Sequence, residues 1–129
     1  MDLWWLPSHL IIAIKRFDNH GLKKYSNSVK YPVKGLDLTD IVKGKGSLDI
    51  FNNKYKEKDN KDNKNKNKNN EKFVYDLYAV INHSGSMNFG HYTATIKFKN
   101  KWFDISDSNV SPTNNPISSQ AYVLCYKKR

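Results

Sequence analysis

A long polar tract constrains how this chain can fold. Residues 52–72 read NNKYKEKDNKDNKNKNKNNEK and contain almost no side chain that could enter a core. A segment of this composition cannot bury enough apolar surface to offset the entropy lost on ordering. The folding material therefore consists of two blocks, roughly residues 3–51 and 73–126. A chain of 129 residues has room for one domain, so we expect a single domain, 1–129, with a polar insertion at about 52–72.

The net charge of +10 raises the question of nucleic-acid binding. The polar tract alone holds eight lysines and four acidic residues, and the remaining excess is scattered, with no arginine-rich helix or aromatic-interleaved patch. Phosphate recognition favours clustered cations. We therefore expect no specific nucleic-acid partner, and a basic nucleic-acid-binding domain is kept as a distant alternative.

The single cysteine, Cys125, excludes an internal disulfide and a cysteine-rich zinc site. It lies in the apolar run AYVLCYKK, which is typical of a buried and unreactive thiol. A lone cysteine fits a reducing, intracellular location, cytoplasmic or nuclear. The apolar start of the chain is interrupted by Asp2 and Pro7, so we expect neither a signal peptide nor a membrane span. We also expect no cofactor and no metal.

Alternating apolar and polar residues predict a mainly β fold, an antiparallel sheet with little helix. The Lys99-Asn100 pair suits a hairpin turn, and residues 106–116 have turn composition. Leu36, Leu38 and Ile41 are expected to pack onto the core. The expected elements are strands at 10–14, 73–82, 91–98, 101–106 and 121–128, a loop from 82 to 90, and a short helix at 117–120.

His91 is the candidate for acid–base chemistry, because it begins a strand directly after a glycine-bearing loop. The predicted hairpin returns Ser106 and Asp107 to the level of His91, where they could orient an imidazole or stabilise an imidazolium. A surface histidine facing a polar turn would show the same spacing, so both interpretations stay open on spacing alone. The other histidines, His9, His20 and His83, lack such partners and are expected in loops or at strand edges.

Four ordered blocks resemble the C-terminal third of the catalytic domain of the ubiquitin-specific proteases, which are papain-like cysteine peptidases. The blocks are LPSHLIIAIKRF, YDLYAVINHSGSMNFGHYTATIK, KWFDISDSNVSP and AYVLCYKKR. The resemblance covers nearly all of the chain outside the polar tract. It implies an α+β catalytic domain whose C-terminal part is this mainly β sheet, and it implies hydrolysis of the bond after the C-terminal glycine of ubiquitin.

By this resemblance, His91 matches the catalytic base, Ser106 the third triad position and Asp107 the acidic residue that assists them. Gly90 and Tyr92 match positions beside the cleft that takes the ubiquitin tail, and the implied partners are ubiquitin and ubiquitinated proteins.

The chain also departs from the family pattern. The block with the nucleophilic cysteine and the paired Cys-x-x-Cys zinc ligands have no counterpart here. Asn88 and Phe89 replace glycines that usually precede the histidine, and Ser106 stands where Asp or Asn is most common. Without a thiolate no acyl-enzyme forms, so we expect this chain to be inactive alone and to need the N-terminal half of the catalytic domain. A non-catalytic ubiquitin-binding remnant is the main alternative.

Overall fold

The computed structural model describes residues 3, 6–18, 20, 23–42, 72–86 and 88–129. Nearly all of the polar tract lies outside these residues, and the insertion stays a prediction.

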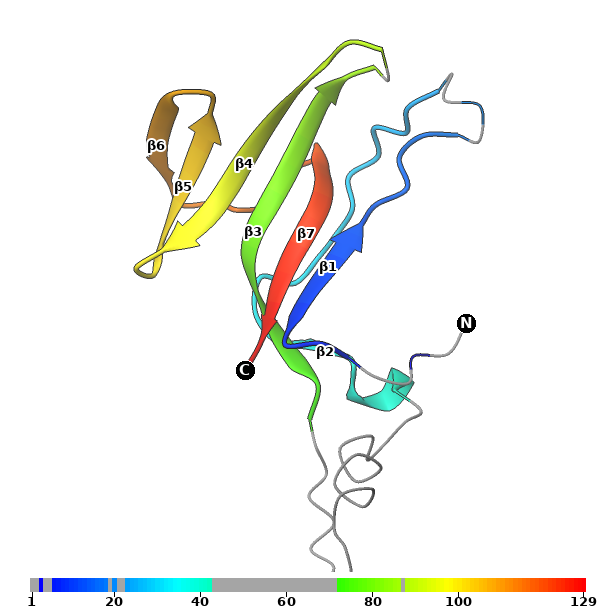
Figure 1. Cartoon of the computed structure of the whole chain (residues 1–129), viewed down its shortest axis with the longest axis vertical. Coiled ribbons are helices and arrows are strands. Elements are labelled where there is room, and N and C mark those ends of the chain that lie inside the picture. The colour runs from blue at the N-terminus through cyan, green and yellow to red at the C-terminus, as the bar shows by residue number, and fades with distance from the viewer. Residues whose placement is uncertain (1–2, 4–5, 19, 21–22, 43–71, 87) are drawn as a thin grey trace, which may run out of the picture.

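One antiparallel sheet dominates the described part of the chain (Figure 1). Its strand order is β1-β7-β3-β4-β5-β6, and β2 pairs with β3 off this path. The mainly β fold with little helix is confirmed, since the described residues contain only one short 3₁₀ helix, η1. The elements are β1 (His9–Ala13), β2 (Leu36–Asp37), η1 (Thr39–Ile41), β3 (Val74–Gly85), β4 (Gly90–Phe98), β5 (Lys101–Ser106), β6 (Asn109–Thr113) and β7 (Ala121–Lys128).

Three of the secondary-structure predictions are wrong. The expected loop from Asn82 is strand, because β3 continues to Gly85 by pairing Ser84 with His91 and Gly85 with Gly90. The expected turn region after Ser106 contains β6, which pairs back onto β5 from Ser106↔Asn109 to Trp102↔Thr113. Residues 117–120 form no helix, and Ser119 and Gln120 are instead a turn before β7.

The core lies on the face of the sheet that residues 31–42 cover. Leu77, Val80, Leu124 and Tyr126 form its floor and are almost fully buried. The covering segment is tied down by two hydrogen bonds, from the Tyr126 hydroxyl to the Pro32 carbonyl at 2.8 Å and from the Leu77 amide to the Val33 carbonyl at 3.0 Å.

Two of the three residues expected to pack from this segment do so. Leu36 and Leu38 are partly buried against the core. The expectation for Ile41 is wrong: it is 54% exposed, because it lies at the end of η1, none of whose residues is buried.

Arg16, which lies three residues after β1, anchors this part of the chain. Its side chain is only 2% exposed, and the guanidinium donates to four backbone carbonyls. The acceptors are Ala121 at 2.7 Å, Tyr25 at 2.9 Å, Asn27 at 2.8 Å and Ser119 at 2.9 Å. One planar cation therefore joins residues 25–27 to the start of β7.

Candidate functional site

The pairing of β4 with β5 brings His91 and Ser106 together. Ala94 lies opposite Ile105, so Ser106 lies at the level of Thr93, on the face that Thr93 and His91 share. Side chains in this diagonal relation can contact each other. The His91 Nε2 and Ser106 Oγ atoms are 3.0 Å apart. The His91 side chain is about half exposed, at 49%, and its Nδ1 has no hydrogen-bond partner within the described ranges.

Asp107 lies beyond this pair, in the two-residue turn between β5 and β6. Its φ of 51° is left-handed, a conformation that aspartate tolerates better than most residues. Its Oδ2 is 3.8 Å from His91 Nε2, and its side chain is 81% exposed. An ion pair this exposed contributes little to stability. It nevertheless places a carboxylate where a positive charge on His91 would be stabilised.

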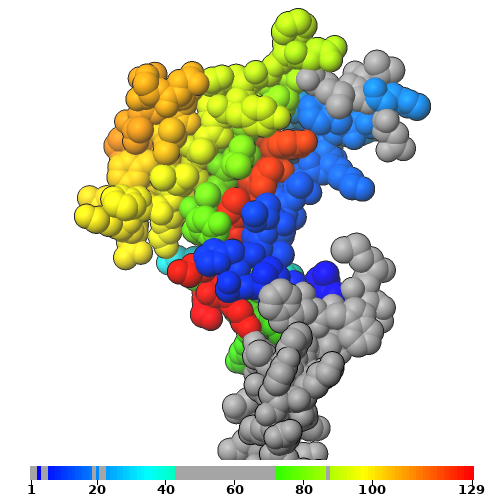
Figure 2. Space-filling model, viewed as in Figure 1, coloured from blue at the N-terminus to red at the C-terminus, as the bar shows by residue number. Residues whose placement is uncertain are grey.

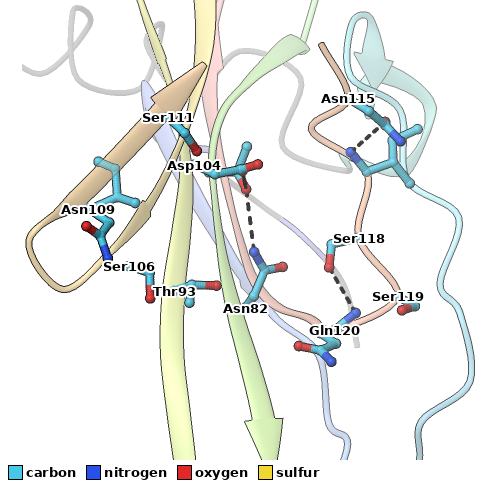
Figure 3. Close-up of a pocket in the computed structure, with 13 residues that line it drawn as sticks. Asn82, Thr93, Asp104, Ser106, Asn109, Ser111, Asn115, Ser118, Ser119 and Gln120 are labelled. Carbon is cyan, nitrogen blue, oxygen red and sulfur yellow. Dashed lines mark hydrogen bonds between the residues drawn. The ribbon is translucent and has the colours of Figure 1, made fainter. Parts of the chain in front are cut away.

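A polar cavity of about 550 Å³ adjoins Ser106 (Figure 3). On its sheet side, Thr95 Oγ1 donates to Asp104 Oδ1 at 2.6 Å, and Asn82 Nδ2 lies 3.5 Å from Thr95 Oγ1. The side-chain oxygen of Asn82, Oδ1, is buried without a partner among the described residues. Figure 3 shows Ser118 and Gln120 on the other side of the cavity.

Asn82, Thr95 and Asp104 were not expected from the sequence to belong to the site. For Thr95 and Asp104 the signal was the alternation of polar residues on β4 and β5, which continues the face that carries His91.

Gly90 and Tyr92 belong to the opposite face of β4. There they contact His83, which is only 4% exposed. The expectation that His83 lies in a loop or at a strand edge is wrong, because β3 continues past it between β4 and β7. His9 does lie on the edge strand β1. His20 is exposed.

The tip of the β3–β4 hairpin is a tight turn that presents an aromatic side chain. The Ser86 amide donates to the Phe89 carbonyl at 2.8 Å, and the Phe89 amide donates to Ser86 Oγ at 3.3 Å. The Phe89 side chain is 84% exposed. Figure 2 shows this end of the molecule standing out beyond the sheet.

Cys125 is remote from His91. It pairs with Ala79 on β3, whereas His91 pairs with Ser84, five residues further along. This offset is roughly 17 Å at about 3.3 Å per residue, and the odd number places the two side chains on opposite faces. Burial raises the pKa of the Cys125 thiol, which disfavours the thiolate.

The described residues contain no group of three or more His, Cys, Asp or Glu side chains that could hold a metal ion. No helix in the same part of the chain is both long and apolar enough to cross a membrane.

Comparison with known proteins identifies the family. The model of the family described as "Ubiquitin carboxyl-terminal hydrolase" matches residues 1–126. Ubiquitin carboxyl-terminal hydrolase 10 of Arabidopsis thaliana is 37% identical over 99% of this chain, and ubiquitin carboxyl-terminal hydrolase 31 of Homo sapiens is 37% identical over all of it. The chain spans only 12% and 10% of these relatives.

Solved structures agree with the sequence relatives. The "Ubp8-Sgf11-Sgf73-Sus1 SAGA DUB module" matches with a TM-score of 0.72 at 25% identity, over 99% of this chain and 25% of the matched one. A related module "bound to monoubiquitin" matches with a TM-score of 0.71 at 25% identity, with the same coverage of both chains. The chain therefore belongs to the ubiquitin carboxyl-terminal hydrolase family.

Proposed function

We propose that this chain is the C-terminal, histidine-bearing part of a deubiquitinating cysteine protease domain, with a polar insertion at about residues 52–72. The reaction is hydrolysis of the peptide or isopeptide bond after the C-terminal glycine of ubiquitin. The observation that carries the proposal is the 3.0 Å contact between His91 Nε2 and Ser106 Oγ, on a fold shared with a module solved with monoubiquitin.

The contact orients His91 as a base. When His91 Nε2–H donates a hydrogen bond to Ser106 Oγ, the Nδ1 lone pair is free to take the proton of a thiol. The resulting thiolate attacks the carbonyl carbon of the ubiquitin glycine, and His91 then passes the proton to the leaving amine. Water hydrolyses the acyl-enzyme in a second step with the same base.

Asp107 stabilises the charged intermediate state of His91. Its carboxylate lies 3.8 Å from the same nitrogen, so it acts mainly when the imidazole carries a positive charge. In this proposal Ser106 orients the His91 ring, in place of the carboxylate or amide that is commoner at the third triad position, and Asp107 supplies the negative charge.

Gly90 and Tyr92 line the path of the ubiquitin tail in this proposal. Tyr92 is 57% exposed next to His91, and Gly90 leaves the backbone accessible at the start of β4. A narrow path between flat or small groups suits a tail that ends in two glycines.

The nucleophilic cysteine comes from another part of the protein. Cys125, the single cysteine of this chain, points away from the His91 face and has a raised pKa. The isolated chain should therefore be inactive on a ubiquitin C-terminal amide, with a Cys125→Ser variant as the control.

The decisive experiment uses the parent protein, or this chain reconstituted with the cysteine-bearing half. His91→Ala should abolish nearly all turnover of a fluorogenic ubiquitin amide, whereas Ser106→Ala should lower kcat roughly ten- to a hundredfold with a smaller change in KM. Asp107→Asn should cost less than Ser106→Ala if it supplies charge only. Wild-type turnover in His91→Ala would refute the catalytic assignment. Binding of ubiquitin with no turnover in the wild type would favour the alternative, a non-catalytic ubiquitin-binding remnant.

A further inference from the structure

His83 is a buried titratable residue that the proposed mechanism does not use. It lies on β3 directly opposite Tyr92 of β4, and its ring is surrounded by aromatic rings. The ring centroids lie 4.6 Å from Tyr92, 5.8 Å from Tyr122 and 5.8 Å from Phe17.

The His83 ring also fills the space beside Gly90. A Cβ atom built on Gly90 would overlap His83 Nε2 and would lie 2.8 Å from the Ser84 carbonyl oxygen. Residue 90 must therefore be glycine, because both the His83 ring and the Ser84 carbonyl exclude a Cβ atom there. The imidazole occupies the volume that a side chain at position 90 would otherwise take.

Gly90 and Tyr92 are the residues immediately before and after His91. Because side chains alternate along a strand, both face His83 while His91 projects to the other side, toward Ser106. The His83 ring therefore packs against both neighbours of the proposed base, on the face of the sheet opposite to the His91 side chain.

Two hydrogen bonds hold the backbone of His83 in place. The His83 amide donates to the Gln120 carbonyl at 3.0 Å, and its carbonyl accepts from Lys24 Nζ at 2.6 Å. Its Nδ1 atom is buried with no hydrogen-bond partner among the described residues. The ring contacts its aromatic neighbours and Gly90, so its shape matters for their placement.

We propose that His83 is a positioning residue, whose flat ring fixes Gly90 and Tyr92 and thereby holds His91 at hydrogen-bonding distance from Ser106. The catalytic consequence rests on the proposed function, but the geometric consequence does not. The two can therefore be tested separately.

The first experiment uses the 129-residue chain alone and reads its histidine side chains by long-range ¹H–¹⁵N NMR. His83→Phe keeps a flat, neutral ring, whereas His83→Leu has a comparable apolar volume without the plane. We expect the tautomer and nitrogen shifts of His91, and the amide shifts of Gly90 and Ser106, to be retained in the Phe variant and changed in the Leu variant. His9→Leu is the matched control, because His9 lies on the edge strand β1 and contacts Tyr78 in an edge-to-face arrangement.

The second experiment measures the same variants in the protein that carries the cysteine-bearing half. Misplacing a base by a fraction of an ångström lowers the rate of the chemical step, so His83→Leu should reduce kcat roughly tenfold or more with KM nearly unchanged. The kcat of His83→Phe should stay within about twofold of the wild-type value. If the imidazole nitrogens were required, the Phe variant would lose activity as the Leu variant does.

The outcomes separate the two proposals. If wild-type protein shows no hydrolysis, the proposed function fails and the NMR comparison still tests the positioning role. Unchanged His91 and Ser106 signals in a folded His83→Leu chain would overturn the positioning role. An effect on KM alone would overturn the catalytic part and assign His83 to binding of the tail.

Discussion

At the scale of single residues, Arg16 contributes to stability through geometry as much as charge. A guanidinium has five donors in a rigid plane, and four carbonyls from two separate segments surround it here. A lysine carries the same charge but has three donors on a flexible stem, so it cannot reach all four acceptors. Buried carbonyls without donors are costly.

Arg16→Lys should therefore lower the free energy of unfolding by about 3 kcal/mol. Urea denaturation of the 129-residue chain measures this change. The matched control is Arg129→Lys, because Arg129 pairs with Asp76 at 2.8 Å but its side chain is 53% exposed, and exposed pairs contribute less than about 1 kcal/mol. Equal losses in the two variants would contradict this account of Arg16.

His83 makes stability depend on pH. Burial, together with the nearby Lys24 charge, lowers the pKa of His83 below the ordinary value of 6.5. The unfolded chain then binds a proton at a higher pH than the folded chain, so stability is fully present above pH 6.5 and is lost as pH falls toward the folded-state pKa.

His83→Phe removes this dependence while other groups titrate as before. Between pH 6.5 and about pH 5, the free energy of unfolding of the wild type should fall more steeply than that of the variant. Chemical denaturation at a series of pH values gives both curves. Parallel curves would show that His83 does not titrate differently in the folded and unfolded states.

At the scale of elements, the β4–β5 hairpin carries measurable backbone strain. Its two turn residues, Lys99 and Asn100, have φ values of 45° and 64°, as a type I′ turn requires. Glycine adopts this conformation without steric cost. Asn100→Gly should therefore raise stability by about 0.5 kcal/mol, and Asn100→Val should lower it. Thermal unfolding of the two variants is the measurement, and a gain with Val would contradict the turn assignment.

The elements that could be predicted from sequence were those with strong alternation or clear turn chemistry. β4 and β5 and the turn at Lys99 and Asn100 are confirmed. The end of β3 could not be read, since Ser84 and Gly85 have weak strand propensity and are strand only because β4 pairs with them. For β6, Ser111 and Pro112 suggested a turn, but an edge strand tolerates proline.

At the scale of the whole molecule, the contact between His91 and Ser106 could be expected from sequence because a single hairpin register determines it. His83 could not be placed in the same way. Its environment combines Phe17 from the chain after β1, Tyr92 from β4 and Tyr122 from β7. Contacts among segments this far apart depend on the strand order, which neither composition nor local spacing encodes. The same holds for the carbonyls that surround Arg16.

The two sides of the polar tract meet in the fold, which leads to the final prediction. The Leu38 amide donates to the Phe73 carbonyl at 2.9 Å, and the Phe73 amide donates to Thr39 Oγ1 at 2.9 Å. Val42 and Phe73 are both buried, at 1% and 4% exposure. Residues 38–42 and Phe73 are thus already joined, so the residues between them need only connect two neighbouring points.

Replacing residues 52–72 with about eight Gly and Ser residues should therefore preserve the fold. Shortening a flexible connection lowers its closure entropy cost, by about 0.6 kcal/mol for each halving of length, so stability should stay the same or rise by about 1 kcal/mol. Thermal unfolding and the NMR signals of His91 and Ser106 check the fold and the site together. Thr39→Val in the shortened chain is a useful comparison for stability, because it removes the hydroxyl that accepts a hydrogen bond from the Phe73 amide. A shortened chain that unfolds without cooperativity would mean that the tract contributes to the core, and the prediction of an insertion would then be wrong.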